Sequence, residues 1–274
     1  MEYLMTYGWA ILIIAVVLGA LFQLGVFNSS SFSPRAPPGA CQVFRPNGPG
    51  TTQNINLMGV CTGQLPQYIA KFNGASYVNV AHSNLYSAQA FTVSFWVSEP
   101  ATQSWTGVVD KGRYGSPYDW YFFTPYTTCS GTGQGIIFSA GGELCYQWND
   151  PVWHFVTGTY STSTLNEYLY VDGALKLNAG VTRFTPQQYP LAVGAASPLF
   201  TSRFAGLIAN VQVYNTSLSA NQIQALYLEG MGSAPMLLQN LVGWWPLNGN
   251  SNDYSGNNNN GVPTAVTFTS QYGK

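Results

Sequence analysis

The sequence predicts a mainly β protein, an antiparallel sandwich of two sheets preceded by one long hydrophobic α-helix. Residues 3–27 contain no charged side chain, and a run of that length forms a helix of roughly 37 Å at 1.5 Å per residue. From Tyr68 onward, about eleven short runs rich in Val, Ile, Phe, Tyr and Trp are separated by Gly, Pro and Asn, as in two-sheet sandwiches.

The hydrophobic segment, residues 1–27, does not have the pattern of a secretory signal peptide. No Lys or Arg precedes Arg35 and no small-residue cleavage site follows the apolar run, whereas a signal peptide has both a basic start and such a site. A plain membrane anchor is physically sound. However, Arg35 and Arg45 flank its C-terminal end, so the positive-inside rule would then place the following domain in the cytoplasm.

The stretch MEYLMTYGWAI resembles the start of archaeal type IV pilin-like proteins. In that family a basic leader ending in Gly is removed, and a glutamate then precedes an unbroken hydrophobic helix. Glu2 and residues 3–27 match this pattern. The printed sequence begins without the basic leader, which we interpret either as a start at an internal Met or as a leader that has been trimmed. The resemblance implies that Glu2 pairs with the N-terminal amine of a neighbouring subunit. It also implies that the helix lies in the membrane before assembly and in a filament core afterwards.

The composition is that of an extracellular β protein rather than a nucleic-acid-binding one. The net charge is −1 and only 7% of residues are charged, so no basic surface is expected to attract nucleic acid. Asn, Gln, Ser, Thr and Gly supply the polar surface, and aromatic residues reach 15%. Because few carboxylates change state on acidification, we expect little sensitivity to acid.

Residues 28–66 are predicted to be a Pro- and Gly-rich linker. Residues 28–50 hold five prolines and three glycines, a composition that favours extended and stiffened backbone. Part of this linker is expected to be stapled by a disulfide bond into a small collar, although a simple linker is also consistent with the composition.

Four cysteines are present, and none forms a C-x-x-C pair, so a zinc site is not expected. Three disulfide pairings are possible. We favour the local one, Cys41–Cys61 with Cys129–Cys145, in which each bond closes a loop of roughly 15–20 residues and contributes about 3 kcal/mol. Disulfide bonds and the glycosylation sequons at Asn28 and Asn215 favour a location outside the cell.

Residues 67–274 are predicted to form one domain. The motifs AKFNGASYVNV, FTVSFWV, VVDKG, WHFVTGTY, LYVDGAL and GLIANVQVYNTSLSANQIQALY are similar, in this order, to those of the laminin-G-like, concanavalin A-like jelly roll. Asp172-Gly173 reads as a hairpin turn between two strands. One helix is expected inside residues 217–230, with Ser217 or Ser219 as its cap and Gly230 as its stop.

The segment LVGWWPLNGNSNDYSGNNNNG, residues 241–261, resembles the part that normally opens such domains, yet it comes last. A circularly permuted strand, the start of a second domain, and a strand donated to the next subunit are the three explanations. We favour permutation, with residues 241–246 as a strand of the chain's own sandwich, because an unpaired strand of this composition would be a sticky edge.

Three kinds of ligand chemistry occur on domains of this type. Some concanavalin-like folds hydrolyse glycans with two facing carboxylates, but no two acids here lie at spacing i, i+2 and no G-x-S-x-G motif occurs. The resemblance implies a calcium site at Asp253 with Asn250 or Asn252; a plain Asn/Gly-rich turn is an equally good reading. Sugar binding by exposed aromatic side chains is the third possibility. The candidates lie within residues 114–126 and around Trp105 and Trp148, and the sequence does not single out one of them.

The sequence therefore predicts a non-enzymatic structural subunit of an extracellular type IV pilus-like filament. Its partners are identical subunits, the membrane before assembly, and surface glycans bound by an outward-facing adhesive head. No cofactor other than calcium is expected. The alternative is a membrane-anchored lectin-like protein that never polymerises, and a glycan hydrolase is the third reading.

Overall fold

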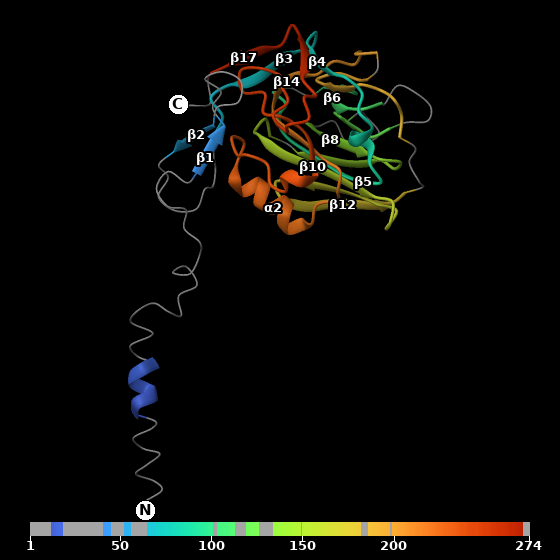
Figure 1. Ribbon diagram of the computed structural model, residues 1–274. Helices are drawn as coiled ribbons and strands as arrows, with labels where there is room; N and C mark the ends of the chain where they lie inside the picture. The colour runs from blue at the N-terminus through green and yellow to red at the C-terminus, as the bar shows by residue number, and fades with distance from the viewer. Residues whose placement is uncertain are drawn as a thin grey trace, which may run out of the picture.

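The computed structural model describes residues 12–18, 41–44, 52–55, 65–100, 103–112, 119–125, 134–148, 150–181, 186–197 and 199–270. Most of them form two antiparallel sheets stacked face to face (Figure 1). The predicted mainly β sandwich is therefore confirmed. The architecture is that of a jelly roll, in which two packed sheets share one apolar core.

Within the long helix expected from the sequence, the structure describes residues 12–18, and these are helical. The rest of residues 1–27, including Glu2, lies outside the described residues, as does Asn28. In the described part of the chain, no helix has the length and apolar character needed to cross a membrane.

The first sheet has eight strands, and all its pairings are antiparallel. Its order is β12 (Ala174–Gly180), β11 (Asn166–Val171), β10 (His154–Ser161), β5 (Ala90–Ser98), β14 (Ala205–Tyr214), β3 (Ile69–Asn73) and β17 (Thr267–Thr269), and β15 (Leu241–Trp245) also pairs with β14.

The second sheet has seven strands. Its order is β16 (Gly261–Thr264), β4 (Tyr77–Val80), β13 (Leu191–Val193), β6 (Gly107–Asp110), β7 (Tyr121–Phe123), β8 (Gln134–Ser139) and β9 (Leu144–Trp148). A separate hairpin joins β1 (Cys41–Phe44) to β2 (Thr52–Ile55). The short 3-10 helices η2 (Asn84–Ser87) and η3 (Leu238–Asn240) lie in connections.

The core lies between the two sheets and is rich in aromatic rings. Phe95 of β5 meets Phe122 of β7 edge to face, with ring centroids 5.0 Å apart, and Phe122 stacks on Phe138 at 4.7 Å. Gly158 of β10 faces these rings, because a Cβ there would lie 2.6 Å from Phe122 and 2.7 Å from Phe138. The glycine therefore lets the sheets approach closely at their centre.

The outer face of the eight-stranded sheet is partly covered by α2 (Ala220–Glu229) (Figure 1). Ser219 caps this helix through a capping box with Gln222, and Gly230 ends it at φ 96°, as the sequence predicted. The buried Ile223 and Leu226 pack into a second apolar cluster with residues of β10, β11, β14 and β15. Strand β5 is consequently buried on both of its faces.

The late strand β15 pairs with β14 of the same chain, with Val211 opposite Trp245 and Gln212 opposite Trp244. Trp245 is fully buried in the core. In this structure the strand thus completes the chain's own sandwich, and the circular permutation stays a prediction. Strands β16 and β17, which follow it, add an edge strand to each sheet; the sequence patterns did not indicate them.

Cys145, on β9, is disulfide-bonded. The side chain of Cys41, together with Cys61 and Cys129, lies outside the described residues. The two local disulfide pairings therefore stay predictions.

Candidate functional site

The carboxylate of Asp253, proposed above for calcium, is the centre of an Asn-rich turn. Its Oδ1 accepts hydrogen bonds from the backbone N–H groups of Trp244 (3.0 Å) and Ser255 (2.9 Å). Its Oδ2 accepts from the Ser255 hydroxyl (2.9 Å) and the Asn259 backbone N–H (2.8 Å). Four donors already surround the two oxygens, so little lone-pair density is left for a cation.

The two asparagines of the predicted calcium set serve the same turn. The Asn250 side-chain oxygen accepts from the Asn252 backbone N–H at 3.0 Å, and its amide donates to the Tyr254 hydroxyl at 2.9 Å. Among the described residues, no three His, Cys, Asp or Glu side chains gather as metal ligands. This donor set does not fit calcium, and the turn instead fixes β15 to the loop before β16.

The second sequon residue, Asn215, directly follows β14 and is half-buried. Its side-chain oxygen accepts a hydrogen bond from the Asn240 amide at 3.1 Å. Glycosylation there stays a prediction.

The acids of the described chain are engaged in structural contacts rather than gathered in a cleft. Nine Asp and Glu side chains are described. Eight of them accept hydrogen bonds from the protein: Glu99, Asp110, Asp119, Glu143, Asp150, Glu167, Asp172 and Asp253. Burial raises the pKa of both Glu99 and Glu167 to about 7, as expected for carboxyls held in apolar surroundings.

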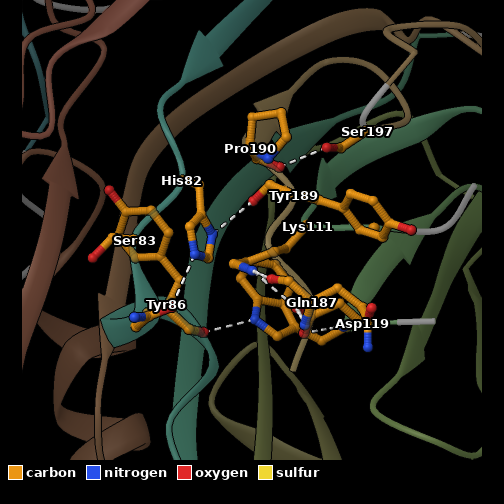
Figure 2. Close-up of polar contacts among 12 residues, drawn as sticks. His82, Ser83, Tyr86, Lys111, Asp119, Gln187, Tyr189, Pro190 and Ser197 are labelled. Carbon is orange, nitrogen blue, oxygen red and sulfur yellow. Dashed lines mark hydrogen bonds and ion pairs between the residues drawn. The ribbon is translucent and has the colours of Figure 1, made fainter. Parts of the chain in front are cut away.

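A buried polar cluster surrounds Lys111, at the end of β6 (Figure 2). Its ammonium donates to Asp119 Oδ2 at 2.9 Å and to the Gln187 carbonyl at 2.6 Å, and the Gln187 backbone N–H donates to Asp119 at 2.9 Å. Both charged side chains have no exposed surface, and burial lowers the pKa of Lys111. A pair without solvent access cannot receive a ligand. The cluster instead holds the loop around Gln187, just before β13, against the end of β6.

His154, at the start of β10, is a second structural polar centre. Its ring nitrogens lie 2.9 Å from Asp172 and 2.9 Å from Asp150, and its ring centroid lies 4.3 Å from that of Trp148. Burial lowers the pKa of His154, but the two aspartates outweigh this and raise it overall. Because both ring nitrogens of His154 already have hydrogen-bond partners, we interpret this histidine as a structural residue at the start of the strand.

An open pocket of about 730 Å³ lies where β14, β3 and β17 run side by side. Its lining contains both polar and apolar side chains, among them Lys71, Asn73, Leu207, Phe268, Thr269 and Ser270. On β3, Lys71 and Asn73 are exposed while Ala70 and Phe72 are buried, so the strand alternation turns the polar pair outward. We call this hollow the mixed pocket.

A smaller pocket of about 360 Å³ lies on the same face of the sheet, beside the end of α2. It is lined by Leu65, Trp96, Trp153, Tyr227, Leu228 and Met231. Trp96 and Tyr227 are stacked, with centroids 5.7 Å apart and planes 23° from parallel. Leu228 is half exposed at its rim, at 50%. We call this hollow the aromatic pocket.

The two pockets are joined by side chains of the outer sheet face. Leu207, which lines the mixed pocket, packs in one cluster with Ile69, Met231, Trp96 and Trp153, and the last three line the aromatic pocket. Ile69 and Met231 of this cluster are buried, at 0% and 6% exposed. We call the two pockets together with the side chains between them, from Lys71 through Leu207 to Tyr227, the outer strip.

The strand register sets the length of this strip. Leu207 lies opposite Lys71 on one side and Ser98 on the other, and Trp96 lies two residues before Ser98. With strands ~4.8 Å apart and ~3.3 Å per residue, the Cα atoms of Lys71 and Trp96 are about 12 Å apart. The two pockets are therefore close enough for one extended ligand to reach both.

The aromatic residues singled out from the sequence are not part of this strip. Trp105 is half-buried and packs against Phe123 at 5.1 Å, and Trp148 is only 7% exposed. Of residues 114–126, positions 114–118 and 126 lie outside the described residues. The side chains that do line the strip come from strands predicted as ordinary core strands, from α2 and the residues beside it, and from β17, whose three residues gave no strand signal.

Comparison with protein families matches residues 72–224 to a family described as the concanavalin A-like lectin/glucanase superfamily, in its laminin-G form. The chain belongs to this superfamily. The matched region extends from β3 into α2 and includes strands of both sheets. The expected laminin-G-like domain is confirmed, whereas no comparison bears on the pilin-like N-terminus. No curated protein sequence matches the chain.

Solved structures show the same fold at low sequence identity. A suspected carbohydrate-binding protein from Bacteroides ovatus superposes with a TM-score of 0.62 at 15% identity, covering 81% of this chain; this chain spans 64% of that protein. A heptameric pentraxin from Limulus polyphemus superposes with a TM-score of 0.51 at 11% identity, covering 74% of this chain and 94% of the pentraxin. At these identities the likeness concerns the fold alone.

A third structure is domain 4 of the arabinanase AbnA from Geobacillus stearothermophilus, solved with arabinotriose. It superposes with a TM-score of 0.45 at 18% identity, covering 58% of this chain and 76% of that domain.

Proposed function

We propose that this superfamily member is a carbohydrate-binding protein that holds a glycan on the outer strip without hydrolysing it. The observation that carries the proposal is the pairing of an aromatic pocket with a mixed pocket on one sheet face. Sugar rings have apolar faces that pack on aromatic side chains, and hydroxyl groups that need hydrogen-bonding partners. The strip offers both, in adjacent places.

The absence of acids from the lining supports a binding role rather than a catalytic one. Neither pocket is lined by an Asp or Glu among its described residues. Hydrolysis of a glycosidic bond ordinarily needs two carboxyl groups within about 5–10 Å of each other across the substrate. A polysaccharide panel should therefore show retention of glycans on the protein and no release of reducing ends.

A glycan array probed with the full chain in mild detergent tests the proposal. Tyr227→Ala should weaken binding about 2- to 10-fold, because one aromatic contact is worth about 0.5–1.5 kcal/mol. Tyr77→Ala is the matched control, since Tyr77 stacks on Phe200 at 4.7 Å and belongs to the other sheet. Equal losses in both variants, or none in Tyr227→Ala, would place the binding site elsewhere.

We further propose that the domain is carried on the cell surface by its N-terminal segment, as an adhesive subunit of a pilus-like filament. The sequence places Glu2 directly before an uncharged apolar run, and an acid there gains from the helix dipole and from a neighbour's amine. In residues 12–18, Leu12, Ile13, Ile14, Val16, Val17 and Leu18 are each 49–63% exposed. Such a surface needs a cover, which is either lipid or identical helices.

Two measurements separate the filament from a plain membrane anchor. Negative-stain microscopy of cells should show extracellular filaments that contain this chain. Glu2→Gln should reduce their number while the head still binds glycan. Confinement of the chain to the membrane fraction, with no filament, would favour the anchored lectin-like protein, and glycan binding would survive in that case.

A further inference from the structure

The mixed pocket contains a cation that no other described group neutralises. Four Lys and Arg side chains are described. Lys111 is paired with Asp119, while Lys176 and Arg203 each lie 5.3 Å from the centroid of a tyrosine ring. Lys71, exposed on β3, has no ion pair, hydrogen bond or ring contact from its side chain within the described residues.

The surroundings of Lys71 are neutral hydrogen-bonding groups. Asn73, Thr269 and Ser270 lie around the same pocket, and eight of the nine described acids are already engaged elsewhere. In a chain with only 7% charged residues and a net charge of −1, one ammonium among amide and hydroxyl groups is a local positive site. Such a site favours an anionic group on the ligand.

We infer that the outer strip selects glycans that contain an acidic sugar, and that Lys71 binds the sugar's carboxylate. This inference rests on the proposed glycan binding and adds the class of ligand. The register places Lys71 about 12 Å from Trp96, so a neutral sugar on the aromatic pocket brings its acidic neighbour to the ammonium. Asn73 and Thr269 then supply partners for hydroxyl groups of the acidic ring.

The test compares oligosaccharides that contain glucuronate, galacturonate or mannuronate with the same oligosaccharides after reduction of their carboxyl groups. Isothermal titration with the full chain should show at least tenfold tighter binding of one acidic form than of its reduced counterpart. That preference should shrink as salt is raised from 50 to 500 mM, because the contact is ionic.

Variants at Lys71 assign the preference to this side chain. Lys71→Met should remove the preference, so that an acidic glycan and its reduced counterpart bind this variant with equal affinity, and Lys71→Arg should keep most of it. Lys176→Met is the matched control, because Lys176 lies on β12 over the Tyr146 ring, outside the strip; it should retain the preference.

The outcomes separate this inference from the proposed function. Binding of neutral glycans with no preference for any acidic form, or a preference that survives in Lys71→Met, would overturn the inference and leave glycan binding intact. Failure of every glycan to bind would overturn both.

Discussion

The buried carboxyl of Glu167 should make the fold more stable in acid than at neutral pH. Glu167 has no exposed surface. Its Oε2 accepts backbone hydrogen bonds from Ala140 at 2.6 Å and Gly142 at 3.4 Å, while Oε1 is buried with no partner in the described residues. Burial, the largest effect, raises its pKa from 4.5 to about 7. A buried charge with one oxygen unpaired is costly, so the protein binds a proton instead.

The pH dependence of stability follows from the difference between the pKa of Glu167 in the folded protein and in the unfolded chain. Between pH 4.5 and 7 the folded protein holds a proton on Glu167 that the unfolded chain has released, so the free energy of unfolding falls as the pH rises. Each pH unit across this window is worth ~1.4 kcal/mol, which gives about 3 kcal/mol in total. Glu99, whose pKa is also raised to about 7 by burial, contributes a similar amount with the same sign.

Urea unfolding of the full chain in mild detergent, at pH 4.5, 5.5, 6.5 and 7.5, measures this dependence. The wild type should lose stability steadily across the series. Glu167→Gln should lose about 3 kcal/mol less than the wild type across the series, with the rest of the loss due to other groups whose pKa is raised, such as Glu99 and His154, and its curve should approach the wild-type curve at low pH. Stability that rises with pH across this window, or an unchanged slope in Glu167→Gln, would refute the assignment of a raised pKa.

Three further changes test the packing of the fold. Lys111→Met leaves the buried Asp119 carboxylate without its cation and should cost about 3–5 kcal/mol in urea unfolding, with recovery in the Lys111→Met/Asp119→Leu double variant; additive losses would contradict the pairing. Gly158→Ala places a methyl group against two core phenylalanine rings and should cost about 1–3 kcal/mol, whereas a neutral change would show that the sheets can separate there. Ser219→Ala removes the capping box of α2. It should lower the free energy of unfolding by about 0.5–2 kcal/mol, which is seen as a lower midpoint of thermal unfolding, and Ser217→Ala is its control.

The sequence was sufficient for the sandwich because local signals there agree with tertiary structure. Alternating apolar residues, the Asp172-Gly173 turn with both φ angles positive (54° and 73°), and the Ser219 cap all act over a few residues. The N-terminal segment is a different case. Its helix is described over residues 12–18 only, so the longer helix that the apolar run predicts stays a prediction.

The binding surface could not be read from the sequence for a different reason. The outer strip is assembled from β3, β5, β14, β17 and α2, and only the strand order brings them together. Lys71 resembled any exposed strand residue, and β17 pairs with β3 over three residues only. Asp253 shows a related limit. In the sequence, an acid in an Asn-rich loop looks like a calcium ligand, and the donors that surround its carboxylate, such as the backbone N–H groups of Trp244 and Asn259, come close only in the fold.

The central claim is that glycan lies on the outer strip, and hydroxyl-radical footprinting tests it most directly. The full chain is oxidised with and without a glycan selected from the array, and modification is quantified by mass spectrometry. Tyr227, Leu228 and Trp153, which line the aromatic pocket, should be protected, while Tyr77 and the 65%-exposed Leu199 should not change. Protection of Tyr77 with none at Tyr227 would contradict the account.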